Sequence, residues 1–271
     1  MTRGSACVVA SLVLTGAVAC AAPSEAPRVD LPVVVDASGA VPVTTDLGYA
    51  VELSSARIAI EDLVFTVAGE VHAESAPVSS PGGLVHGLLI PMAHAHPGHY
   101  QGGEVTGELL GAFVVDWPAD EGRELGVATL IATTYSAANF GFGRGSAEDL
   151  DAEDPLVGHT AIVSGSATKD GVTTAFTIVV DSPEDRELVG APFDASLDED
   201  AAGTLALRFN TADALEGDTL FDGLDFAALD ADGDGELVIQ PDAAEAELAA
   251  AYDLFRRTLQ THDHYAVALQ N

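Results

Sequence analysis

The chain has 271 residues, with 43 Asp and Glu against only 10 Lys and Arg, and its formal net charge is −33. A charge of this sign and size argues against nucleic acid and anionic lipid headgroups as partners, because both are themselves anionic. It favours cations as ligands. The acidic residues are spread through the chain rather than gathered in one tail, so much of this charge belongs to a solvated surface.

The first twenty residues have the pattern of a targeting segment. Arg3 gives a positive start, and the apolar stretch 8–19 is too short to span a bilayer. Two cleavage sites compete. Ala17-Val18-Ala19 is a small-x-small site for the general signal peptidase. The same residues followed by Cys20 resemble a bacterial lipoprotein signal, although Ala17 stands where Leu is usual.

We therefore expect residues 1–20 to be a signal peptide and the mature protein to be exported. Its one membrane contact is then a lipid on Cys20, at the cell envelope (outer membrane or periplasm) or at the cell surface. Cys7, the only other cysteine, is lost with the signal peptide. The mature chain thus has no internal disulfide and no thiolate for metal binding or nucleophilic catalysis.

The following residues predict a tether and then a β-domain. Residues 21–44 are rich in Pro and Ala and indicate a flexible tether. Residues 45–210 carry the alternation of half-buried strands, with a change of phase at Glu61-Asp62 that predicts a bulge. Lys169-Asp170-Gly171 predicts a hairpin turn. Strands are expected at 48–53, 57–67, 104–117, 125–135, 157–167, 172–181 and 204–209, and the stretch 143–154 is expected to be a loop.

Residues 211–271 predict a C-terminal helical segment. Asp242 is suited to cap a helix whose apolar side chains recur at helical spacing. Those side chains are Leu248, Ala251, Tyr252, Phe255 and Leu259. The expected fold is therefore mainly β, an antiparallel β-sandwich or barrel with a C-terminal helical extension.

Five of the eight histidines lie in two short clusters. The first contains His94, His96 and His99, and the second contains His262 and His264. Imidazole is the commonest protein ligand of borderline transition metals. On extended backbone, residues two apart project to the same side, so each cluster is a candidate part of one metal site. The alternative is that both clusters are solvated loops.

Two further histidines are candidate ligands, although a purely structural role is an equal alternative for each. His72 alternates with two glutamates on an expected strand, and His159 stands at the start of another strand. Imidazole with carboxylate support suits Zn²⁺ first and then Cu²⁺ or Ni²⁺. Asp263 lies between two candidate ligands and is placed to orient one of them.

A second cation site is expected near the C-terminus. The run Asp230-Ala-Asp232-Gly-Asp234-Gly235 resembles the start of an EF-hand calcium loop, with oxygen ligands at positions 1, 3 and 5 and glycine at position 6. The Glu236 carbonyl would supply position 7. Position 12, normally a bidentate Glu, is Pro241, and Asp242 is its candidate substitute, so we expect weak Ca²⁺ binding. The alternative is an acidic turn without an ion.

A local resemblance suggests an enzyme. The run His94-Ala-His96-Pro-Gly-His99 after an apolar stretch, followed by Gly158-His159-Thr160, looks like the histidine motifs of the metallo-β-lactamase superfamily. This resemblance implies an αββα fold and a metal-bound hydroxide held by these four histidines. Gly98 stands where the motif has Asp, and the expected strands of residues 45–210 have almost no helices between them.

The function expected from the sequence is transition-metal binding, most simply of zinc, for metal capture or handling at the cell envelope. Metal ions are the expected partners, a protein partner is left open, and binding is favoured over turnover because no placed acid or base is visible. Two alternatives remain. One is a Ca²⁺-stabilised structural or adhesive surface β-domain, and the other is a metal-dependent hydrolase.

Overall fold

The computed structural model describes residues 26–67, 104–183, 186–213 and 215–271. The protein is mainly β, with 52% of the described residues in strands and 12% in helices, which confirms the expected class. The strands are β1 Arg28–Asp36, β2 Val43–Thr44, β3 Ala50–Val67, β4 Glu104–Asp116, β5 Glu124–Ile131, β6 Thr134–Phe142, β7 Ala161–Lys169, β8 Val172–Val180, β9 Glu187–Ser196, β10 Thr204–Phe209, β11 Glu236–Ile239 and β12 Tyr265–Gln270. The helices are α1 Phe226–Leu229 and α2 Ala246–Leu259, with 3₁₀ turns η1 Ala37–Gly39 and η2 His262–His264.

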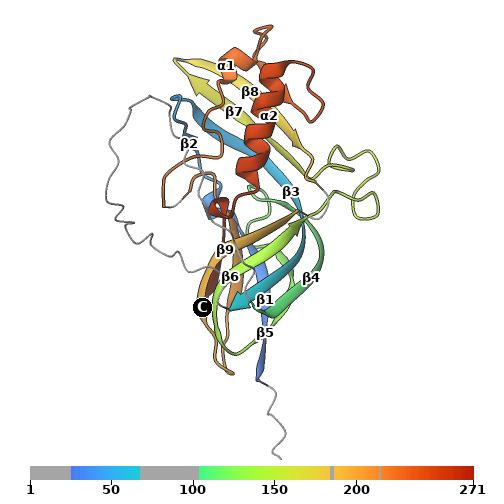
Figure 1. Cartoon of the computed structure of the whole chain (residues 1–271), viewed down its shortest axis with the longest axis vertical. Helices are drawn as coiled ribbons and strands as arrows, with labels where there is room; N and C mark the ends of the chain where they lie inside the picture. Colours follow the sequence, from blue (N-terminus) through green and yellow to red (C-terminus); the bar gives the residue numbers. More distant parts are fainter. Residues whose placement is uncertain (1–25, 68–103, 184–185, 214) are drawn as a thin grey trace, which may run out of the picture.

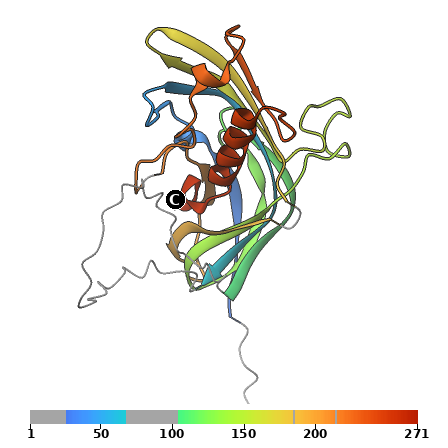
Figure 2. The ribbon, with the colours of Figure 1, turned by 45° about the horizontal axis from the view of Figure 1, so that its top comes forward.

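The long strand β3 organises the sheet. Its first half pairs with β7 and its second half with β6, while β4 lies along the opposite edge. One arm continues from β4 through β5, β1 and β10 to β12, and another continues from β6 to β9. Because β12 and η2 lie against β9, these strands curl into a barrel-like wall (Figures 1 and 2). The strands β7, β8 and β11 extend the sheet beyond this wall.

The sheet is mixed rather than purely antiparallel. Most ladders are antiparallel as expected, but β1 pairs with β10 and β8 pairs with β11 in parallel. A parallel pair needs a long connection between its strands. Here strands β2 to β9 lie between β1 and β10 in the sequence. These long-range pairs follow from the closure of the sheet and carry no local signal.

Two local turn predictions are confirmed. Asp62 has φ 50°, and the register between β3 and β4 shifts between Glu61 and Leu63, which is the bulge that the change of phase predicts. Asp170 and Gly171 have φ 53° and 80° and connect β7 to β8. Two successive positive φ values match the twist of a two-residue hairpin.

The tether predicted over residues 21–44 is too long. Arg28–Asp36 forms β1, which lies between β5 and β10 inside the sheet. Its residues Val29, Leu31, Val33 and Val35 are all buried. Proline content suggested a linker, yet Pro32 is tolerated within the strand. Burial of alternate apolar side chains outweighs the loss of one main-chain donor.

The C-terminal segment is helical only in part. α2 buries Ala251, Tyr252, Phe255 and Leu259, as its spacing predicts. The prediction that Asp242 caps this helix is wrong, because the N-cap residue is Glu245 and makes no side-chain capping bond. β11 and β12, both in the segment expected to be helical, are strands of the same sheet as the β-domain. The segment therefore completes the sheet.

Aromatic side chains fill the core in three groups. The first, within the barrel-like wall, is Trp117, Phe140, Phe142, Phe209 and Tyr265, and the second is Phe65, Tyr135 and Phe193. The third lies between β8 and the C-terminal helices and comprises Tyr49, Phe176, Phe221, Phe226 and Phe255. This third group supports the candidate site described next.

Candidate functional site

The candidate cation site is the loop between α1 and β11. Asp230, Asp232 and Asp234 each offer a carboxylate oxygen, and these oxygens lie within 4.8 Å of one another. Among the described residues this is the only group of three or more His, Cys, Asp or Glu side chains arranged so closely. At this spacing in water each pair repels by about 1 kcal/mol. The attraction of each carboxylate to a bound divalent cation would outweigh this repulsion.

Hydrogen bonds within the loop fix its backbone. Asp230 accepts from the N–H groups of Gly233 at 3.1 Å and of Gly235 at 3.0 Å, one on each carboxylate oxygen. Asp234 accepts from the N–H of Glu236 at 2.8 Å. Gly233 and Gly235 have φ 68° and 85°, values that favour glycine. The loop thus turns at Gly235, where the EF-hand pattern places its glycine, and also at Gly233.

Buried side chains anchor both ends of the loop. Phe226, in α1, is fully buried and packs against Phe176 of β8 with ring centroids 5.2 Å apart. Leu237 and Ile239, in β11, are buried while β11 pairs with β8. The loop therefore joins two segments that both pack on β8. A cation bound there would stabilise this docking.

The loop departs from an EF-hand after its sixth residue. The main-chain carbonyl of Gly235 accepts from the N–H of Ala175 in β8. Successive carbonyls along a strand point to opposite sides, so the Glu236 carbonyl points away from β8. The Asp242 side chain is not a member of the carboxylate group, and Pro241 lies in a turn. α2 begins only at Ala246. The described geometry supplies three carboxylates and no twelfth-position ligand.

A residue far away in the sequence supports the loop, and the sequence reasoning missed it. Tyr49 donates a hydrogen bond from its hydroxyl to Asp225 at 2.6 Å and accepts one from the N–H of Ala227 at 3.1 Å. Asp225 is the N-cap of α1 and accepts from Ala228. The hydrogen bond from Tyr49 lowers the pKa of the Asp225 carboxyl. Lys169 lies over the Tyr49 ring, 4.9 Å from its centroid.

Most of the predicted histidine site lies outside the described residues. The stretch 68–103, outside the described residues, contains His72, His94, His96 and His99. The structure therefore does not test these four candidate ligands. The three remaining candidates, His159, His262 and His264, belong to no group of three close ligands within the described part of the chain. The transition-metal site stays a prediction of the sequence.

The second histidine cluster adopts a 3₁₀ turn rather than extended backbone. With three residues per turn, side chains two apart leave the helix in different directions. His264 is buried, and its Nδ1 lies 3.0 Å from the carbonyl oxygen of Asn210. Because a carbonyl only accepts, Nδ1 carries the proton. Burial lowers the pKa of His264. His262 contacts Asp263 through Nε2 at 2.8 Å.

His159 lies in a cluster of polar contacts at the end of β8. Its Nδ1 lies 2.7 Å from Asp181, and Arg144 lies 3.6 Å from the same carboxylate oxygen. Tyr252 of α2 both donates to the Asp181 carbonyl and accepts from its N–H. These contacts with the protein fix the position of His159, and its role as a metal ligand stays a prediction of the sequence.

Comparisons of the chain with protein-family models, with curated proteins and with solved structures found no match. The αββα fold implied by the metallo-β-lactamase resemblance differs from the observed architecture. The described residues form one mixed sheet with one short and one longer α-helix. None of the described helices is long and apolar enough to cross a membrane.

Proposed function

We propose that the chain is an exported, Ca²⁺-binding structural β-domain of the cell envelope. The observation that carries the proposal is the convergence of Asp230, Asp232 and Asp234 on a loop whose sequence resembles the start of an EF-hand loop. Export and lipid attachment through Cys20 rest on the first twenty residues alone. The net charge of −33 raises the local concentration of cations at the surface.

Calcium is the cation that this donor set favours. Carboxylate and carbonyl oxygens are hard ligands, and no imidazole or thiolate belongs to the carboxylate group. Mg²⁺ requires near-ideal octahedral geometry, whereas Ca²⁺ accepts irregular sites completed by water. The exposed loop leaves room for such water. We expect a dissociation constant of about 0.1–1 mM, the range of extracellular calcium modules.

The proposed role of the ion is to hold the C-terminal segment on β8. Phe226, a member of the third aromatic group, precedes the loop, and Leu237 follows it. Both are buried in the hydrophobic core. An ion that fixes the loop therefore favours both contacts at once. Because the ion binds only the folded loop, it adds to the free energy of unfolding by linkage.

Thermal unfolding of the purified protein with and without 10 mM CaCl₂ tests the proposal. With a dissociation constant of about 0.1–1 mM, Ca²⁺ adds roughly 1.4–2.7 kcal/mol, or a rise in Tm of roughly 3–10 °C. The Asp230→Asn/Asp232→Asn variant should lose this rise. The matched control, Asp194→Asn/Glu199→Gln, removes the same charge from exposed side chains outside the loop and should keep it. Equal responses of both variants would contradict the proposal.

A further inference from the structure

Strands β4 and β5 are hydrogen-bonded over only part of their length. Their ladder consists of Gly107 with Leu130 and Glu108 with Thr129, and no other ladder joins them in the described ranges. Each strand then carries a glycine in an unusual conformation, Gly111 with φ 135° and Gly126 with φ 154°. The register of each strand with its other neighbour also shifts at that level. Such bulges bend strands, so β4 and β5 diverge.

The divergence leaves one edge of β4 unpaired. Ala59, which faces Val114 across the β3–β4 ladder, directs its N–H and carbonyl to the opposite side, toward Thr160 and Gly143. The main-chain groups of Val114 therefore point toward β5, and alternation gives Ala112 the same direction. The Arg123 side chain donates to the Val114 carbonyl. No described residue satisfies the N–H groups of Ala112 and Val114.

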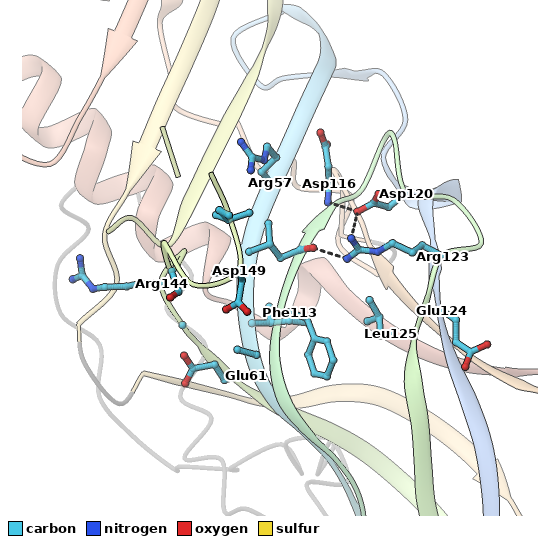
Figure 3. Close-up of a pocket in the computed structure, with 17 residues that line it drawn as sticks. Arg57, Glu61, Phe113, Asp116, Asp120, Arg123, Glu124, Leu125, Arg144 and Asp149 are labelled. Atoms are coloured by element: carbon cyan, nitrogen blue, oxygen red, sulfur yellow. Dashed lines mark hydrogen bonds and ion pairs between the residues drawn. The ribbon is translucent and has the colours of Figure 1, made fainter. Parts of the chain in front are cut away.

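A groove of about 480 Å³ lies along this edge and is lined by residues of β3, β4 and β5. We call it the β4 groove, and it is bounded by residues 57–61, 112–116, 120–125 and 143–150. Phe113 and Leu125 supply an apolar floor, and both are half-buried (Figure 3). An unpaired strand edge beside an apolar floor is the arrangement to which an extended peptide adds as a further strand.

The three arginines of the β4 groove are already held by the protein. Arg57 donates to both carboxylate oxygens of Asp154, at 2.9 and 2.8 Å. Arg123 pairs with Asp120 at 3.3 Å. Arg144 donates to the main-chain carbonyls of Gly158 and Ser182 and contacts Asp181. Their charge is therefore compensated within the protein, and the groove offers little to an anion.

Three carboxylates of the β4 groove have no such compensation. The side chains of Glu61, Glu124 and Asp149 are exposed and form no ion pair or hydrogen bond with a described residue. Glu61 and Asp149 lie on one side of β4 and Glu124 on the far side of Leu125 (Figure 3). Free negative charge on both sides of an apolar floor is complementary to a cationic, partly apolar ligand.

We propose that the β4 groove binds an extended basic segment of another protein, which adds as a strand to the free edge of β4. Main-chain hydrogen bonds would form with Ala112 and Val114. Side chains alternate in direction along an extended peptide, so apolar residues would face Phe113 and Leu125 while basic residues reach the free carboxylates. The proposal does not depend on calcium binding at the Asp230 loop.

Synthetic peptides test the proposal. The probe is acetyl-Val-Lys-Val-Lys-Val-Lys-Val-amide, titrated into the purified protein by calorimetry at 150 mM salt. The peptide with Glu in place of Lys should bind at least about tenfold more weakly. The Lys peptide methylated on every backbone nitrogen should lose binding, because neither of its edges can then donate to a strand edge. Residue-resolved hydrogen exchange should show slower exchange at Ala112 and Val114 when the Lys peptide is bound.

Two charge variants separate the groove from the general charge of the surface. Glu124→Gln/Asp149→Asn should weaken binding of the Lys peptide by about threefold or more. Asp151→Asn/Glu153→Gln removes the same charge from exposed residues outside the groove and should leave binding unchanged. Equal loss in both variants, or undiminished binding of the methylated peptide, would show non-specific charge attraction. Either result, or no binding of the Lys peptide, overturns the proposal.

Discussion

The Tyr49 hydroxyl donates to Asp225 at 2.6 Å, although 176 residues separate the two in the sequence. Tyr49 lies just before β3, the strand around which the sheet is organised, and Asp225 caps the helix that leads into the Asp230 loop. The hydrogen bond thus connects the β-domain with the candidate calcium loop. Tyr49 is buried and also packs on Phe226 with ring centroids 5.3 Å apart.

Tyr49→Phe should weaken both stability and calcium binding. The variant keeps the ring packing but removes a hydrogen bond to a charged group, which contributes about 1.5–3 kcal/mol. Urea unfolding measures the loss of stability. Calcium titration should show a higher dissociation constant, because Asp225 and the start of the loop are less well fixed. Tyr135→Phe, which removes a buried hydroxyl hydrogen-bonded elsewhere, should destabilise the protein without changing calcium affinity.

Gly235→Ala should lower calcium affinity beyond its effect on stability. Gly235 has φ 85°, and the nearest atom to an added Cβ would be 3.8 Å away, so backbone strain rather than a clash is the main consequence. A left-handed residue other than glycine costs about 1–2 kcal/mol. Gly217 has φ 80° with no atom within 4 Å of an added Cβ, so Gly217→Ala is the matched control. If both variants retain the same calcium affinity, the loop does not hold the ion.

The pair Asp36–Arg208 should make stability depend on acidic pH. Arg208 donates to Asp36 at 2.8 and 2.6 Å across the parallel β1–β10 pair, and Asp36 is 5% exposed. Burial acts to raise the pKa of Asp36, but hydrogen bonds from Ser38 and Arg208 outweigh it and lower the pKa. A lowered folded-state pKa means stability that is present above the unfolded value of about 3.9 and is lost as pH falls through the folded value.

Asp36→Asn should therefore destabilise the protein at pH 7 by about 1–3 kcal/mol and flatten the acid limb of its stability curve. Chemical unfolding between pH 2 and pH 7 measures both effects. Asp194→Asn, at an exposed position on β9, is the control, and its stability should depend on pH as that of the wild type does. A wild-type curve that is already flat below pH 4 would contradict the assigned role of the pair.

Local chemistry accounts for what the sequence predicted well. The Asp170-Gly171 hairpin, the bulge at Asp62 and the apolar face of α2 each depend on residues close together in the chain. The grouping of the Asp230 loop belongs to the same class, because its three aspartates and two glycines lie within six residues. Such features need no knowledge of the remaining fold.

Long-range pairing accounts for what the sequence missed. A tether is predicted over β1 because residues 21–44 are rich in Pro and Ala, whereas the burial of its alternating apolar side chains depends on β5 and β10. β11 and β12 are short strands that gain their partners only when the chain returns to the sheet. The Tyr49–Asp225 contact and the unpaired edge of β4 likewise arise from the assembled sheet. No local pattern distinguishes these residues from their neighbours.

The histidine clusters yield a prediction that is independent of the calcium loop. If His94, His96 and His99 form a transition-metal site with the second cluster, the purified protein should hold about one equivalent of zinc, copper or nickel. His264 can contribute only Nε2, because its Nδ1 donates to the Asn210 carbonyl. Elemental analysis after reconstitution should then show loss of metal in both His94→Ala/His96→Ala and His262→Ala/His264→Ala.

His159→Ala is the comparison at a histidine already paired with Asp181. Metal retained when the second cluster is removed would mean that the first cluster binds alone. Calcium as the only metal found would leave the Asp230 loop as the one cation site supported by experiment.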